Sequence, residues 1–73
     1  MKNEDIMIAL ADILEVEPNA ISADDKLEDF EAWDSVAVLS VISLYTDITG
    51  KFIHASEILK MTTVSDIINL LSI

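Results

Sequence analysis

Apolar residues recur at intervals of three and four along most of this chain, and only one proline and one glycine, Pro18 and Gly50, interrupt them. Such spacing puts apolar side chains on one side of an α-helix, where they can pack against another helix. A chain of 73 residues forms at most one domain. We therefore expect a single all-α domain over residues 1–73, rather than a disordered acidic segment.

The first helix is expected to begin with Asn3 as its N-cap and to end at or before Pro18. The next segment, residues 17–33, has its apolar residues at irregular intervals. It is predicted to be a long ordered loop. Several of its apolar residues are expected to pack against the core, from among Ile21, Leu27, Phe30 and Trp33.

The second helix is expected to begin at Asp34 or Ser35 and to run to about Thr49, because Gly50 can end it in a left-handed conformation. Its broad apolar side is predicted to face the core and comprises Val38, Leu39, Val41, Ile42, Tyr45 and Ile48. A narrower, mostly polar stripe is expected on the other side, at Val36, Ser40, Ser43 and Asp47.

Two shorter helices are expected in the last third of the chain. A helical turn is predicted at residues 55–60, with inward-facing side chains at Ile58, Leu59 and Met61. The last helix is expected to begin with Thr62 or Thr63 as its N-cap, and Asp66 stands where a capping-box acid would. These segments predict a small four-helix bundle, with three main helices, one short helix and a long loop between the first two.

Acidic residues dominate the charge, fourteen against four lysines, for a formal net charge of −10. Eleven of the acids and two of the lysines lie in residues 1–34. Such a surface repels nucleic acid and anionic membranes, and it attracts partners with basic surfaces. The N-terminal segment lacks the basic region of a signal peptide, no apolar stretch reaches the length of a membrane span, and cysteine is absent. We expect a cytoplasmic monomer with no nucleic-acid partner, no membrane insertion and no metal site.

Residues 34–36, Asp-Ser-Val, resemble the Asp-Ser-Leu motif of acyl and peptidyl carrier proteins, which opens the second helix after a long loop. Residues 60–64, Lys-Met-Thr-Thr-Val, are similar to the segment that opens the last helix of bacterial acyl carrier proteins. The resemblance extends over essentially the whole chain. It implies a carrier without catalytic activity, with 4′-phosphopantetheine attached to Ser35 and with Asp34 and Val36 as the flanks of the motif.

The resemblance also implies protein partners. These are a phosphopantetheinyl transferase, a ligase that loads an acyl or aminoacyl group, and acyltransferase or synthase enzymes with basic docking surfaces. The face presented to them is predicted at Val36, Ala37, Ser40, Ser43 and Asp47. Fatty-acid carriers usually have several acids along the second helix, whereas here the acids lie in residues 24–31. We therefore expect a specialised carrier, whose pathway and cargo the sequence leaves open.

Several alternatives remain at this point. The cargo could be a peptidyl or aminoacyl group, or the chain could be an acidic interaction module that never receives the arm. Without the resemblance, Asp34 and Ser35 are simply residue types favoured at helix starts. The acidic residues 23–31 lack the ligand spacing and central glycine of an EF-hand loop. His54 has no evident nucleophile beside it and is expected in an exposed loop, with a pH-dependent partner contact as the alternative.

Overall fold

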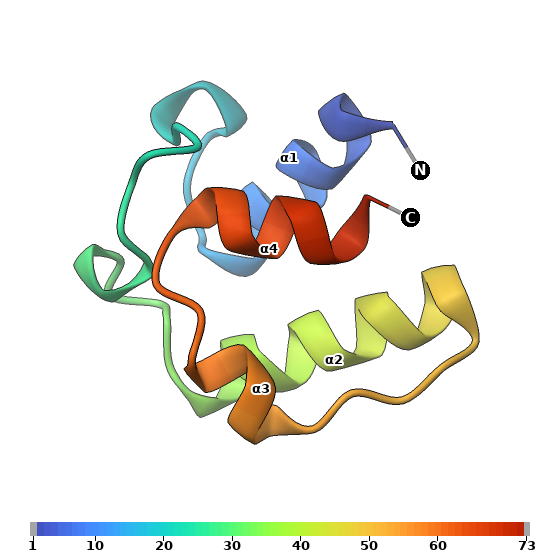
Figure 1. The fold of residues 1–73 in the computed structure, drawn as a ribbon. Coiled ribbons are helices and arrows are strands. Elements are labelled where there is room, and N and C mark those ends of the chain that lie inside the picture. Colours follow the sequence, from blue (N-terminus) through green and yellow to red (C-terminus); the bar gives the residue numbers. More distant parts are fainter. Residues whose placement is uncertain (1, 73) are drawn as a thin grey trace.

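The computed structural model describes residues 2–72, and Figure 1 shows how they are arranged. They form the α-helices α1 (Asn3–Ile13), α2 (Ser35–Thr49), α3 (Ala55–Leu59) and α4 (Val64–Leu71). Two 3-10 turns, η1 (Pro18–Ala20) and η2 (Leu27–Asp29), lie between α1 and α2. No strand occurs within residues 2–72, so the prediction of an all-α fold is confirmed.

The start of α1 differs from the prediction. Lys2 occupies the N-cap position without a side-chain cap bond, so the prediction that Asn3 caps this helix is wrong. Asn3 is instead the first helical residue, and its side-chain oxygen lies 3.1 Å from the Ser72 hydroxyl. The same hydroxyl donates to the Ile68 carbonyl at 2.6 Å. The start of α1 therefore lies beside the residue that follows α4.

The end of α1 is closed by a residue other than glycine. Glu15 has a left-handed backbone, with φ at 59°. Its N–H donates to the Asp12 carbonyl at 3.2 Å, and the Val16 N–H donates to the Ala11 carbonyl at 3.0 Å. These two bonds are the pair that commonly ends a helix when its next residue is left-handed. They turn the chain away from α1 before Pro18.

The boundaries of α2 and α4 agree with the sequence signals. α2 begins directly after Asp34, whose side chain caps it, and Gly50 follows its last residue with φ at 71°. α4 begins after Thr63, and the reciprocal capping bonds between Thr63 and Asp66 are both present. Each of these ends depends on contacts within a few residues, which is why a local pattern was sufficient to predict it.

The core lies where α4 packs between α1 and α2, as Figure 1 shows. α3 packs against α2. The buried side chains of this core are Ile6, Leu10, Ala11, Leu14, Ile21, Leu27, Val38, Val41, Ile53, Ile58, Val64, Ile67 and Leu71. The radius of gyration, 10.9 Å, is close to the value of about 11 Å expected for a compact domain of this length. Within residues 2–72, no helix is both long and apolar enough to cross a bilayer.

Residues 23–27, in the connection between α1 and α2, pair with residues 62–65 at the start of α4. Backbone N–H groups of Leu27, Val64 and Ser65 donate to the carbonyls of Thr62, Asp25 and Ala23 respectively, each at 2.9 Å. Ile21 and Leu27 are buried, and Phe30 and Trp33 are half-buried against the core. The predicted anchoring of this connection by its apolar residues is therefore confirmed.

Candidate functional site

The start of α2 places Ser35 at the surface beside a capped helix terminus. The Asp34 carboxylate accepts hydrogen bonds from the backbone N–H groups of Val36 and Ala37, at 3.0 and 3.1 Å, through the same oxygen, Oδ1. Ser35, between the cap and these donors, is exposed and is the first residue of the helix. Its hydroxyl is therefore open to an enzyme that approaches from solvent, next to the positive end of the helix dipole.

The predicted partner face of α2 is only partly exposed. Val36 is 68% exposed, and Ser43 and Asp47 are also exposed. Ser40 is half-buried, and its hydroxyl donates to the Val36 carbonyl at 3.1 Å. Ala37 is 3% exposed, so the prediction that it contacts partners is wrong. Ala37 lies at the bottom of a depression between the end of α1 and the start of α2, which Ile13 and Ala32 also line.

The remaining residues of this face lie at increasing distances from Ser35. The rise of about 1.5 Å per helical residue puts Ser43 about 12 Å and Asp47 about 18 Å farther along the axis. Ser35, Val36 and Ser40 therefore belong to one site, whereas Ser43 and Asp47 do not border it.

Beside Ser35 lies a groove of about 350 Å³ between α2 and α3, here called the apolar groove. It is lined by Trp33, Asp34, Ser35, Val38, Leu39, Ala55 and Leu59. Leu39 is 62% exposed and Leu59 is 65% exposed, so the prediction that both face the core is wrong. α1 and α4 cover one side of α2, and the short α3 buries only Ile58, which leaves these two leucines uncovered.

On the other side of the start of α2 lies a second depression, of about 380 Å³, here called the acidic hollow. It is lined by Asp12, Ile13, Glu15, Ala32, Asp34, Val36, Ala37 and Ser40. Three of these residues carry a carboxylate, and none is lysine, arginine or histidine. The hollow is therefore a region of negative potential, and Val36 is an exposed apolar residue on its edge.

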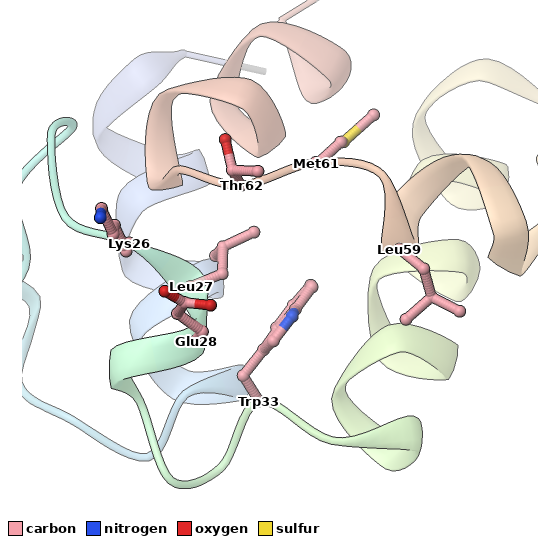
Figure 2. A pocket seen from close by; sticks show the side chains of 7 residues that line it. All are labelled: Lys26, Leu27, Glu28, Trp33, Leu59, Met61 and Thr62. Carbon is pink, nitrogen blue, oxygen red and sulfur yellow. The ribbon is translucent and has the colours of Figure 1, made fainter.

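Trp33 separates the apolar groove from a third depression of about 280 Å³, which Figure 2 shows from close by. The Trp33 ring lies between Leu27 and Leu59, with Met61 and Thr62 across from it. Trp33 is half-buried, as predicted for an anchor of the connection. Its indole thus forms a wall of both depressions and holds the segment before Ser35 against the core.

The other candidate residues lie apart from this site. His54 is exposed, as predicted, and precedes α3; its ring meets the exposed Phe52 ring edge-on, with 5.1 Å between centroids. Among residues 2–72, no group of three or more His, Cys, Asp or Glu side chains is placed to hold a metal ion.

Sequence reasoning did not assign Leu39, Leu59, Asp12 or Glu15 to this site. Leu39 could have been found, because residue i+4 from Ser35 lies on the same side of a helix. The positions of the other three depend on how α3 and the end of α1 pack against α2, and no local pattern reports that.

Comparisons with protein-family models, with curated proteins and with solved structures found no match.

Proposed function

We propose that this chain is an acyl carrier protein, which holds acyl or related intermediates as thioesters on a 4′-phosphopantetheine arm attached to Ser35. The observation that supports the proposal is an exposed serine in the first turn of α2, directly after its capping aspartate. This is the position of the modified serine in the family that residues 34–36 resemble. In this proposal, the helices form the four-helix bundle of that family, with the connection between α1 and α2 as its long loop.

The residues around Ser35 fit a phosphodiester at the surface. The N-terminal end of α2 favours a negative charge. Asp34 already accepts the N–H groups of Val36 and Ala37, so these donors are not free to hold a phosphate. The phosphate would therefore sit in solvent beside the helix end, and the arm would be free to swing. When attached, the group supplies a terminal thiol for the thioester; the chain itself supplies no catalytic group in this proposal.

The protein partners in this proposal are a phosphopantetheinyl transferase, a loading ligase, and synthase or acyltransferase enzymes that receive the cargo. The net charge of −10 supports partners with basic surfaces. Acids are sparse along α2, where Asp47 is the single charged residue. This distribution supports the specialised carrier over the housekeeping carrier of fatty-acid synthesis, and poor activity in a reconstituted fatty-acid synthase is the expected result.

The proposal is tested by intact mass after incubation with coenzyme A and a promiscuous phosphopantetheinyl transferase. A gain of one phosphopantetheine is expected for the wild-type chain and none for Ser35→Ala. Ser35 is exposed, so the alanine variant should fold normally, and circular dichroism checks this. No gain with several transferases would overturn the proposal.

One observation favours a second candidate, the acidic interaction module without an arm. Val36, Leu39 and Leu59 are large, exposed and close to Ser35, as at a protein-binding surface. Failure of the mass test would favour this second candidate. For an interaction module without an arm, we expect Ser35→Ala to leave the binding activity unchanged.

A further inference from the structure

We infer that the outer side of α1 is a docking surface for a basic amphipathic helix of a partner protein, and that this surface is separate from the site around Ser35. An apolar side chain of the partner helix would occupy a depression between α1 and η1, here called the α1 depression. The inference goes beyond the proposed carrier function and does not require it.

The α1 depression has a volume of about 290 Å³ and is lined by Ile8, Ala11, Asp12, Val16, Glu17 and Pro18. Within Asn3–Ile13, Ile8 is the one large apolar side chain that is exposed, at 55%. A single exposed apolar residue is ordinary on a protein surface, but Ile8 borders a depression with Val16 and Pro18 as further apolar walls. Pockets for small molecules usually have about 300–1,000 Å³, so this smaller space suits one protein side chain better than a free ligand.

Acids gather at the end of α1 where they do not help the helix to fold. The C-terminal end of a helix carries partial negative charge, so acids there lower stability and bases raise it. Asp12 lies in the last turn of α1, which contains no basic residue, and Glu15 and Glu17 follow the helix. No lysine, arginine or histidine is among the residues that line the α1 depression. A lysine or arginine of a partner would offset this unfavourable charge.

The arrangement of side chains on α1 favours a helix as the occupant. Glu4, Ile8 and Asp12 are four residues apart, so they form a ridge of about 12 Å along the outer side of α1. Helices pack by placing such ridges into each other's grooves. An apolar residue between two acids is complementary to a helix that presents an apolar residue between two bases. A second copy is not complementary, because it would bring the same acids and another net charge of −10.

The α1 depression lies away from the groove beside Ser35. The apolar groove is between α2 and α3, and α1 and α3 lie on opposite sides of α4 in Figure 1. Asp12 also borders the acidic hollow, whereas Ile8 and Glu17 border neither the groove nor the hollow. A helix centred on Ile8 would therefore leave Ser35 accessible to a second protein.

The probe for the test is a synthetic peptide of about 18 residues, long enough to form a helix, with leucines along one side and lysines along the other. A peptide of the same composition, with both residue types spread around the helix, is its control. The amphipathic peptide is titrated into the nitrogen-15-labelled chain. We expect the amide signals of residues 8–17 to change most, and the control peptide to bind at least about tenfold more weakly.

Two variants separate the apolar and the charged contributions. Ile8→Ala should raise the dissociation constant of the amphipathic peptide about tenfold, and it should keep α1 intact because alanine favours a helix. Glu4→Gln with Glu17→Gln should weaken binding at low salt and make it less dependent on ionic strength. Glu17 makes no side-chain cap bond to η1, so its replacement does not remove a contact of the fold.

The matched controls replace residues that do not line the α1 depression. They are Phe52→Ala, which removes a 69% exposed aromatic ring, and Asp24→Asn with Glu57→Gln, which removes two exposed acids. Both should leave the dissociation constant within about twofold of the wild-type value. Controls that weaken binding as much as the test variants would overturn the proposal. Signal changes centred on Leu39 and Leu59 would overturn it too, because they would place the peptide in the apolar groove.

Two further measurements decide whether the α1 surface is separate and what covers it. Phosphopantetheine transfer to Ser35 should have the same kcat/KM, within about twofold, in the wild-type and Ile8→Ala chains. A tenfold loss in the variant would overturn the separation of the two sites. A dimer of the wild-type chain that Ile8→Ala abolishes, seen by sedimentation, would overturn the proposal by assigning the surface to a second copy. No mass gain on the wild-type chain would overturn the carrier function alone, and the peptide titration would still decide the α1 surface.

Discussion

The Asp34 carboxylate affects both the stability of the start of α2 and the charge beside Ser35. Its carboxylate satisfies two N–H groups that the first turn of α2 would otherwise leave without partners. The same carboxylate stands beside Ser35, where it adds negative charge next to the proposed phosphodiester. An aspartate here therefore stabilises the helix start. In the proposed carrier it would also leave the attached phosphate without the Val36 and Ala37 N–H groups as partners.

We expect Asp34→Ala to lower the free energy of unfolding by about 1 kcal/mol, because the cap bonds to Val36 and Ala37 are lost. Asp34→Asn should retain most of the stability, because its side-chain oxygen can accept the same bonds. Urea denaturation followed by circular dichroism measures both. Equal losses in the two variants would show that the charge beside the helix dipole, rather than the hydrogen bonds, carries the stabilisation.

Single residues also show where prediction from the sequence succeeds. The caps at Asp34 and Thr63 were predictable, because their partners lie two or three residues away. The predicted cap at Asn3 was wrong, because α1 begins one residue earlier and Lys2 occupies the N-cap position. The Asn3 side chain lies instead beside Ser72, a neighbour that is distant in sequence and that no local motif reports.

At the scale of elements, the connection between α1 and α2 belongs to the core. Leu27 is 1% exposed, although it lies in a 3-10 turn, and its N–H donates to the Thr62 carbonyl at 2.9 Å. The pairing of residues 23–27 with residues 62–65 holds this connection against the start of α4. It therefore positions the segment that leads into Ser35.

We expect Leu27→Ala to destabilise the fold by about 2–5 kcal/mol, the usual loss for a buried leucine. This is a large part of the total for a chain of this size, about 4–11 kcal/mol at typical values per residue. The matched control is Leu39→Ala, which removes an exposed leucine and should change stability by less than about 0.5 kcal/mol. Thermal melts compare the two, and similar losses would mean that the connection is not part of the core.

The exposure of Leu39 and Leu59 could not be predicted from the apolar pattern of their helices. Helical spacing grouped Leu39 with the apolar side of α2, but that side is wider than the area that α1 and α4 cover. Which apolar residues stay outside depends on the length and angle of the neighbouring helices. Since α3 has five residues, it cannot cover the groove beside Ser35.

At the scale of the molecule, two effects change the stability of the fold in opposite directions as the pH falls. One comes from the net charge of −10, and the other from the capping of α4. Protonation of the many surface acids relieves their mutual repulsion and favours the compact state. Asp66 behaves differently. Its carboxylate accepts hydrogen bonds from the backbone N–H groups of Thr62 and Thr63, at 3.0 and 3.1 Å.

Those two backbone bonds hold the pKa of Asp66 below its ordinary value of 3.8 in the folded state. The bond from Thr62 has the larger effect, and the bond from Thr63 has the next largest. A carboxyl group whose pKa is lower when folded stabilises the fold above its unfolded pKa. This contribution is lost as the pH falls through the lowered folded value. Asp66 also carries the capping box of α4, directly after the residues that pair with residues 23–27. Protonation of this one group therefore weakens the cap at the start of α4.

We expect the stability difference between the wild-type chain and Asp66→Asn to be constant from neutral pH down to about pH 5 and to shrink below about pH 4. Asparagine keeps an acceptor for the backbone bonds but does not titrate, so the difference isolates the ionised carboxylate from the other surface acids. Urea denaturation at a series of pH values measures it. A difference that stays constant until the wild-type chain unfolds would show that the charge of Asp66 does not stabilise the start of α4.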